Sequence, residues 1–116
     1  MKNEDCLFCK IVSGEVPSKE IYEDDNFIGI LDINPLAEGH TLIIPKKHFR
    51  NLLDLPTTLG NELLEAIKKV SLKLIDDGYA EGVNVQSSNE SAAQQEVFHT
   101  HVHIIPRKKD DNVKLN

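Results

Sequence analysis

One stretch of the chain has the hydrophobic period of a long helix, and it lies between segments that have the period of strands. From about Thr57, apolar residues recur at intervals of three and four positions, and Gly78 follows as a candidate C-terminal cap. The apolar positions are Leu59, Leu63, Ile67, Val70 and Leu74. A helix with one apolar face must bury that face against another layer, and here the flanking elements are strands. The pattern therefore predicts an α+β domain with its helices on one side of a sheet.

Short segments rich in branched and aromatic residues lie on both sides of this helix and are separated by turn residues. The predicted strands are residues 21–23, 27–32, 40–44, 83–86 and 98–105. Near the N-terminus, residues 6–13 are compatible with a short helix that stops at Gly14. We expect an antiparallel sheet of about five strands with one long and one short helix, in a single domain formed by residues 1–116.

Three of the five histidines alternate within the last predicted strand. Residues i, i+2 and i+4 of a strand point to one face, so His99, His101 and His103 would form a row of imidazoles, with Thr100 and Val102 on the other face. A single histidine in a strand is usually structural, but three in alternation indicate a chemical surface. One metal ion could bind all three only with strain, because the outer Cα atoms lie roughly 13 Å apart along a strand.

The other interpretation of the row is nucleophilic catalysis. A neutral imidazole whose Nδ1 proton is held by a carbonyl presents its other nitrogen as a nucleophile near neutral pH, since its ordinary pKa is about 6.5. Attack on phosphorus would form a phosphorus–nitrogen bond that water can hydrolyse in a second step. Neighbouring histidines could orient the nucleophile, neutralise phosphate charge or protonate a leaving group.

The pair Cys6 and Cys9 has three interpretations when it is taken alone. It is compatible with half of a zinc site, with a redox pair, or with two cysteines on one helical turn. A redox role is favoured by a thioredoxin-like βαβ context, which this region lacks. Tetrahedral zinc needs two further ligands, and histidine nitrogen is the usual complement to thiolate.

The net charge of −6 argues against a nucleic-acid-binding surface, because contacts to a phosphate backbone need a basic face. The basic clusters at Lys46, Lys47 and Arg50 and at 107–109 are interpreted as solvated edges. The acidic N-terminus does not resemble a signal peptide, and no apolar run approaches the roughly 18 residues of a membrane span. We therefore expect a cytoplasmic protein without membrane or nucleic-acid partners, in which the cysteines are thiols or metal ligands. Residues 1–4 and 108–116 are expected to be flexible.

The string HTHVHII at 99–105 resembles the signature of the histidine triad (HIT) family, in which histidines alternate with apolar residues. Four further strings match the family in order and spacing: YEDD at 22–25, DINP at 32–35, GHTLIIPKKH at 39–48 and IIPR at 104–107. The likeness extends over about residues 5–107. The resemblance implies a HIT-like fold whose sheet is extended by homodimerisation.

For HIT relatives with an N-terminal cysteine pair, the resemblance implies a structural zinc site. It would be formed by Cys6, Cys9, His48 and His99. The ligand set is complete for tetrahedral zinc, so a bound ion would have no open position for substrate. Phosphoryl transfer needs mostly positioning and charge stabilisation, so no catalytic metal is required.

The resemblance also implies catalytic roles. His101 corresponds to the nucleophile that becomes nucleotidylated, while His103 and His40 correspond to the histidines that complete the active site around the α-phosphate. His99, the first member of the triad, is counted with them, although a zinc ligand would anchor the strand rather than carry protons.

Several further positions match nucleotide-binding positions of the family. Asp32 corresponds to an acid that accepts hydrogen bonds from the ribose hydroxyls, although composition alone favours a turn residue before Pro35. The amide of Gln95 is expected to donate to a phosphoryl oxygen. The complete set of predicted nucleotide-binding residues is Leu7, Phe8, Ile11, Ile30, Asp32, Ile33, Ser88, Asn89, Gln95, Val97, His101 and His103. The apolar members of this set could equally be ordinary core.

This chain departs from the family pattern in the loop before the triad. Where many relatives have two asparagines and a glycine, it has Ser88, Asn89 and Glu90, and Gln94 replaces a common glycine. Glu96 stands where one branch has a serine that assists the leaving group. Because of these changes, the leaving-group preference of the family is not carried over to this chain.

The resemblance implies a purine nucleotide hydrolase or transferase that acts at the α-phosphate through a nucleotidyl-histidine. Its favoured reaction is hydrolysis of a nucleoside 5′-phosphoramidate to the monophosphate, with ligands of the AMP or GMP type. One alternative is a dinucleoside polyphosphate hydrolase of the Fhit type. Another is a zinc-stabilised nucleotide-binding regulatory module whose catalysis is incidental.

Overall fold

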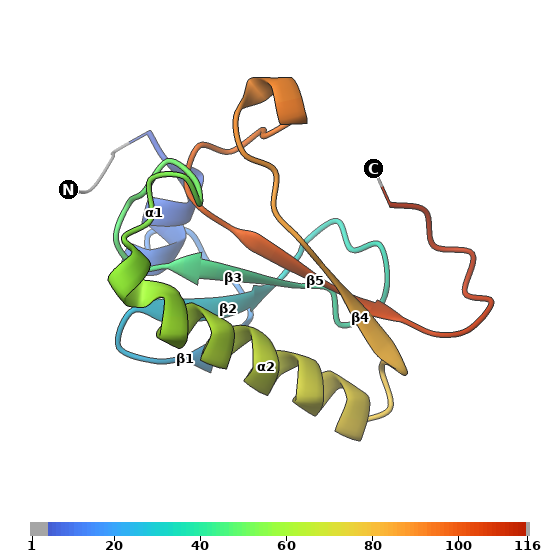
Figure 1. Ribbon diagram of the computed structural model, residues 1–116. Helices are drawn as coiled ribbons and strands as arrows, with labels where there is room; N and C mark the ends of the chain where they lie inside the picture. Colours follow the sequence, from blue (N-terminus) through green and yellow to red (C-terminus); the bar gives the residue numbers. More distant parts are fainter. Residues whose placement is uncertain (1–4, 116) are drawn as a thin grey trace.

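Five antiparallel strands form one sheet in the order β1-β2-β3-β5-β4, shown in Figure 1. The strands are β1 (Glu20–Glu23), β2 (Phe27–Leu31), β3 (Thr41–Pro45), β4 (Gly82–Gln86) and β5 (Val102–Arg107). The helices are α1 (Leu7–Ser13) and α2 (Gly60–Asp76), with two short 3-10 helices, η1 (Thr57–Leu59) and η2 (Ser91–Ala93). This computed structural model describes residues 5–115, so the expected flexibility of residues 1–4 and 116 lies outside the described residues. The predicted α+β class, strand number and antiparallel pairing are confirmed.

The long helix α2 covers one face of the sheet. Its buried apolar residues are Ala66, Val70 and Leu74, and they pack with Phe27, Ile43, Val102 and Ile104 of the strands. Leu63 and Ile67 pack at the margin of this cluster, as the helical period predicts. The predicted helix start at about Thr57 is instead a 3-10 turn that leads into the α-helix at Gly60.

The opposite face of the sheet carries α1, so the expectation that both helices lie on one side is wrong. Ile28, Ile30, Leu42 and Ile44 pack there with Phe8 and Cys9 of α1. These strand residues alternate with those that contact α2, and successive side chains of a strand point to opposite faces. Because β2 and β3 are apolar at nearly every position, both faces need a cover, and their continuous apolar runs were a signal of this.

The last strand begins at Val102 rather than at residue 98. The main-chain N–H of Thr100 donates to the carbonyl of Phe49 at 2.7 Å, and its hydroxyl donates to the same oxygen at 3.0 Å. These bonds tie the segment before β5 to the segment after β3 and leave it irregular. His99 and His101 therefore precede the strand that was predicted to contain them, although the ring centres of His101 and His103 still lie 5.2 Å apart.

Gly39 permits a close approach between the turn before β3 and α2. Its φ is +93°, and a Cβ atom there would lie 2.9 Å from Leu74 Cδ2. Only glycine meets both requirements without strain. The turn therefore delivers His40 to the start of β3, on the same face as Leu42 and Ile44.

The segment after β5 is held by Asp111. Its carboxylate accepts hydrogen bonds from the Arg107 guanidinium at 2.8 Å and from the main-chain N–H of Lys108 at 2.9 Å. The N–H of Lys109 donates to Glu81 at 2.7 Å. The expected flexibility of this tail stays a prediction beside these contacts. Among residues 5–115, no helix is both long and apolar enough to span a bilayer.

Candidate functional site

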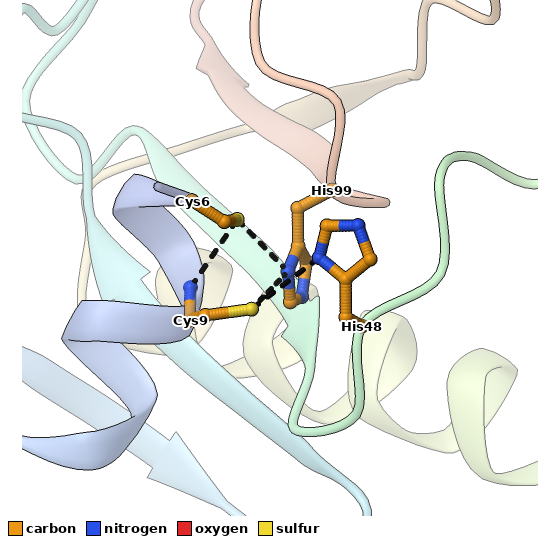
Figure 2. A group of neighbouring side chains, drawn as sticks. All are labelled: Cys6, Cys9, His48 and His99. Atoms are coloured by element: carbon orange, nitrogen blue, oxygen red, sulfur yellow. Dashed lines mark hydrogen bonds between the residues drawn. The ribbon is translucent and has the colours of Figure 1, made fainter. Parts of the chain in front are cut away.

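Two cysteines of the first turn of α1 face two histidines that come from distant parts of the chain, as Figure 2 shows. His99 Nδ1 lies 3.4 Å from Cys6 Sγ and 3.5 Å from Cys9 Sγ. His48 Nδ1 lies 3.3 Å from Cys9 Sγ. The four atoms that could bind a metal lie within 4.8 Å of one another. The structure thus brings together all four residues of the predicted metal site, which we call the Cys2His2 group.

The orientation of these side chains fits a metal ion. His99 Nε2 lies 2.8 Å from the carbonyl of Pro45, which can only accept, so Nε2 carries the proton and Nδ1 presents a lone pair to the sulfurs. Burial lowers the pKa of His99 to about 4, and burial also lowers the pKa of His48, so both rings are neutral. In tetrahedral zinc sites, sulfur and nitrogen ligands lie about 3.6 Å apart, close to these separations.

Cys6 would be stable as a thiolate only beside a cation. The residue is 8% exposed, and burial raises the pKa of its thiol. A buried thiolate is unfavourable without a positive neighbour, and a bound divalent ion supplies one. The donor types, their spacing and their burial therefore all fit zinc.

A second group of possible ligands, Asp32, His40 and His103, is better described as a hydrogen-bonded relay. The main-chain N–H of Leu36 donates to His40 Nδ1 at 3.1 Å, so neutral His40 carries its proton on Nε2. This Nε2–H donates to His103 Nδ1 at 2.9 Å. A metal on His40 Nε2 would require a proton on Nδ1, directly opposite the Leu36 N–H. The geometry therefore argues against a metal ion here.

The relay leaves His103 with its proton on Nε2, as a hydrogen-bond donor. Burial, together with the nearby His101 and His40, lowers the pKa of His103 to about 4. Burial also lowers the pKa of His40, against the opposing effect of the Asp32 carboxylate. Both rings are neutral at neutral pH, and each has a defined tautomer.

His101 has the tautomer that was predicted for a nucleophilic imidazole. Its Nδ1 lies 2.8 Å from the carbonyl of His99, so Nδ1 carries the proton and Nε2 keeps its lone pair. Burial lowers the pKa of His101, which keeps the ring unprotonated. The ring centres of His101 and His103 are 5.2 Å apart. A nucleophilic nitrogen and a hydrogen-bond donor thus lie side by side.

Gln95 does not have the free amide that was predicted for it. Both donors of its Nε2 are engaged, with the carbonyl of Arg50 at 2.7 Å and that of Val97 at 3.0 Å. Its Oε1 accepts from the N–H of Glu90 and from the Asn51 amide. The side chain is only 5% exposed, so it braces the loop and is not aimed at a phosphoryl oxygen. The sequence alone does not show that two main-chain carbonyls lie within reach of the Gln95 amide.

The loop that contains Ser88 and Asn89 is joined to the histidine segment by the preceding residue, Ser87. The hydroxyl of Ser87 donates to the carbonyl of His101 at 2.7 Å. Asn89 accepts from the N–H of Leu52 at 2.8 Å, which joins the loop to the segment after β3. The loop is therefore attached to the nucleophile at one end and to residues 50–52 at the other.

Glu90 has a backbone conformation that side chains rarely adopt, with φ +79° and ψ 160°. Two contacts between its carboxylate and the Arg50 guanidinium, each 2.9 Å long, hold it there, and the Asn51 amide adds a third at 2.6 Å. These hydrogen bonds lower the pKa of Glu90 to about 2. The role of Arg50 was missed, since it was interpreted as part of a solvated edge. The signal was Glu90 itself, which stands where relatives have glycine.

The apolar residues of the predicted purine pocket divide into two sets. Phe8 and Ile30 belong to the buried cluster beneath α1, and Ile11 and Val97 pack against it. In contrast, Leu7 is 44% exposed and Ile33 is 86% exposed. Of these residues, Phe8 and Ile30 are buried, so they could contact a base only after a change in the core.

Asp32 has the turn role that was weighed for it, and its contact with the ribose hydroxyls stays a prediction. Its Oδ1 accepts from the N–H of Asn34 at 2.9 Å, which is the turn interaction expected before Pro35. Its Oδ2 lies 3.6 Å from His40 Nε2 and 4.0 Å from His103 Nδ1. The turn therefore aims one carboxylate oxygen at the histidine relay.

The site is marked by this chemistry and not by the size of a cavity. An open cavity of about 460 Å³ lies elsewhere, where its lining includes Tyr79, Pro106 and Asp111. None of the five histidines or two cysteines lines it.

A five-stranded antiparallel sheet that carries hydrogen-bonded neutral histidines beside a buried Cys2His2 group defines a class of small α+β proteins. The HIT domain model matches residues 13–110. The chain belongs to the HIT family.

Relatives with described activities cover most of the chain. It is 41% identical over 109 residues to adenosine 5′-monophosphoramidase HNT1 of Candida albicans, which is 90% of this chain and 72% of that protein. It is 43% identical over 107 residues to adenylylsulfatase HINT3 of Arabidopsis thaliana, which is 92% of this chain and 54% of that protein. The crystal structure of a zinc-bound histidine triad family protein from Mycobacterium smegmatis matches with a TM-score of 0.91 and 41% identity, over 97% of this chain and 81% of that one.

The strain at Glu90 leads to a prediction about stability. Replacement of Glu90 by glycine or by alanine removes the contacts with Arg50. Alanine must still adopt an unfavourable positive φ at this position, whereas glycine adopts it without strain. We expect Glu90→Gly to unfold at a higher urea concentration than Glu90→Ala. In an Arg50→Gln background the difference between the two should persist, because it comes from the backbone. Equal unfolding midpoints for the glycine and alanine variants would contradict the strain.

Proposed function

We propose that this protein is a purine nucleotide hydrolase or transferase that acts at the α-phosphate through a nucleotidyl intermediate on His101. The observation that carries the proposal is the 2.8 Å contact between His101 Nδ1 and the His99 carbonyl, which leaves Nε2 free for attack. The proposed substrate is a nucleoside 5′-phosphoramidate. A relative named as an adenosine 5′-monophosphoramidase supports this choice.

In the first step, His101 Nε2 attacks the α-phosphorus and forms a phosphorus–nitrogen bond. The bond between phosphorus and the amine breaks with its electron pair on nitrogen, and the amine leaves after it takes up one proton from solvent water. The Nδ1–H of His101 stays on the His99 carbonyl, which stabilises the positive charge on the ring. The adduct is therefore set up by a contact that is already present.

In the second step, water attacks the same phosphorus. Its oxygen bonds to phosphorus, one of its protons is released, and the electron pair of the broken bond returns to Nε2. His103 can donate its Nε2–H to a phosphoryl oxygen in both steps, while His40 positions His103 through their 2.9 Å contact. The products are a nucleoside monophosphate and a regenerated neutral imidazole.

The leaving group is the part of the proposal that needs a comparison of substrates. Adenosine 5′-phosphosulfate would release sulfate from the same phosphorus, and a relative named as an adenylylsulfatase is the reason to include this substrate. A dinucleoside polyphosphate would release a nucleotide. Because all three share the nucleophile, rates on matched substrates distinguish them and the geometry of His101 does not.

We also propose that the Cys2His2 group holds a structural zinc ion. The ligands that would bind it are the sulfurs of Cys6 and Cys9 and the Nδ1 atoms of His48 and His99. The separations of 3.3 to 3.5 Å and the zinc-bound relative support this assignment. Such an ion supplies charge balance for two buried thiolates and joins α1 to the segments that flank β3 and β5.

The covalent intermediate gives the main test. After rapid quenching with adenosine 5′-phosphoramidate, intact-mass spectrometry should detect an added nucleotidyl mass that maps to His101. We expect no adduct on His101→Ala and an unchanged adduct on Thr58→Ala, an exposed change in η1. Repetition with adenosine 5′-phosphosulfate and a dinucleoside polyphosphate identifies the preferred leaving group. Nucleotide binding without adduct or turnover on any of them would instead favour a regulatory binding module.

The metal assignment makes a separate prediction about composition. Purified protein should contain about one zinc per chain by elemental mass spectrometry. Cys9→Ser should lose the metal and unfold at lower temperature, because a buried ligand set is left incomplete. Asp32→Asn changes the relay and should keep the metal, which makes it the matched control. Equal zinc content in Cys9→Ser and the wild type would contradict the assignment.

We further propose a homodimer formed through β4. Among the described residues, β4 pairs only with β5, so one edge of the sheet is open, and Val85 on it is 50% exposed. Open edges readily pair with another strand. Sedimentation equilibrium should give twice the chain mass of 13.0 kDa, and Val85→Lys should shift it toward 13.0 kDa. A wild type that sediments at the mass of one chain would overturn the dimer.

A further inference from the structure

Phe8 lies between the two cysteines in the sequence and between two histidines in space. Its ring centre is 5.0 Å from that of His101, with 71° between the planes. It is 5.9 Å from that of His99, with 87° between the planes. Phe8 is 5% exposed, so these edge contacts are part of the buried interior. One aromatic ring therefore contacts the proposed nucleophile and a residue of the Cys2His2 group.

The position of Phe8 depends on what anchors α1. The helix has seven residues, which is too few for a helix to be stable by itself. At its first turn, Cys6 and Cys9 contact His99, and Cys9 also contacts His48. Its remaining anchor is the apolar cluster with Ile28 and Ile44. The Cys2His2 group thus holds the same turn of helix that carries Phe8.

A second route joins the Cys2His2 group to the nucleophile. The ring of His99 is held at both nitrogens, by the sulfurs on Nδ1 and by the Pro45 carbonyl at 2.8 Å from Nε2. The main-chain carbonyl of the same residue accepts the Nδ1–H of His101 at 2.8 Å. His99 is fully buried, at 0% exposure. The anchored side chain therefore limits movement of the main-chain carbonyl that sets the tautomer of His101.

We propose that Phe8 is a positioning residue for His101, held in place by the Cys2His2 group. Its ring restricts rotation of the His101 imidazole, so that Nδ1–H stays on the His99 carbonyl and Nε2 faces the substrate. A ring that rotates away loses this acceptor and can carry its proton on Nε2, where no lone pair remains for attack. The consequence for rate rests on the proposed function of His101, but the consequence for the tautomer does not.

This role is separable from contact with a purine base. A residue of the base pocket acts on nucleotide affinity, whereas a residue that orients the nucleophile acts on the chemical step. Loss of the ring–ring contact should therefore change the rate of adduct formation more than the dissociation constant for AMP. It should also change the state of the His101 ring with no nucleotide present.

The test uses Phe8→Leu, which keeps an apolar side chain, and Phe8→Tyr, which keeps the ring. Val12→Ala is the matched control, because Val12 lies on α1 and packs against the same cluster. Ring nitrogen NMR of the metal-loaded protein should show a single Nδ1–H tautomer for His101 in the wild type, Phe8→Tyr and Val12→Ala. Phe8→Leu should show a mixture of tautomers. Chelation of the metal from folded wild-type protein should produce the same mixture and also serves if Phe8→Leu does not fold.

The kinetic arm uses rapid quenching with adenosine 5′-phosphoramidate and titration with AMP. In Phe8→Leu we expect the labelling rate to fall at least about tenfold, with the dissociation constant for AMP changed by less than about threefold. An unchanged His101 tautomer in both Phe8→Leu and the chelated wild type overturns the positioning role, whatever happens to affinity. If the wild type forms no adduct, the proposed function fails, and the NMR result still decides the positioning role.

Discussion

The arrangement of the site depends on one buried residue, His99, which is held at three atoms. Its Nδ1 faces two sulfurs, its Nε2–H donates to Pro45, and its carbonyl accepts from His101. Because the residue is fully buried, solvent cannot replace any of these partners. The side chain joins the segment before β5 to α1 and β3, while the main-chain carbonyl sets the tautomer of the next histidine, His101. A single residue thus anchors this segment and fixes the tautomer of His101.

The sheet order explains how residues distant in sequence reach this point. The chain makes α2 and β4 after β3 and then returns, so that β5 lies between β3 and β4. Leu42 of β3 is paired with His103 of β5, which brings His40 and His103 onto the same face. The relay from Leu36 through His40 to His103 follows from this pairing. Neutral rings with defined tautomers are then maintained by burial, which opposes protonation.

The secondary structure and the main site residues were largely predictable, because they depend on local patterns and on short motifs. The helical period located α2, Gly14 ended α1 as expected, and the five strands were found to within a few residues. Two predictions failed for a shared reason, because the start of β5 and the free amide of Gln95 both depend on main-chain partners from elsewhere in the chain. Thr100 and Gln95 find such partners at Phe49, Arg50 and Val97. The placement of both helices on one side failed for a different reason, since β2 and β3 have apolar side chains on both faces.

The sequence by itself determined the fold class, the residue types at the site and the family, since periodicity and motif spacing are properties of the chain order. Only the tertiary structure decided which nitrogen of each histidine carries the proton, and which of the two groups of possible ligands is suited to a metal ion. Histidine occurs in both candidate metal groups. In one, the ring nitrogen opposite the metal position donates to Pro45, and in the other it accepts from Leu36. The direction of a hydrogen bond depends on which main-chain group lies opposite, and folding alone sets that.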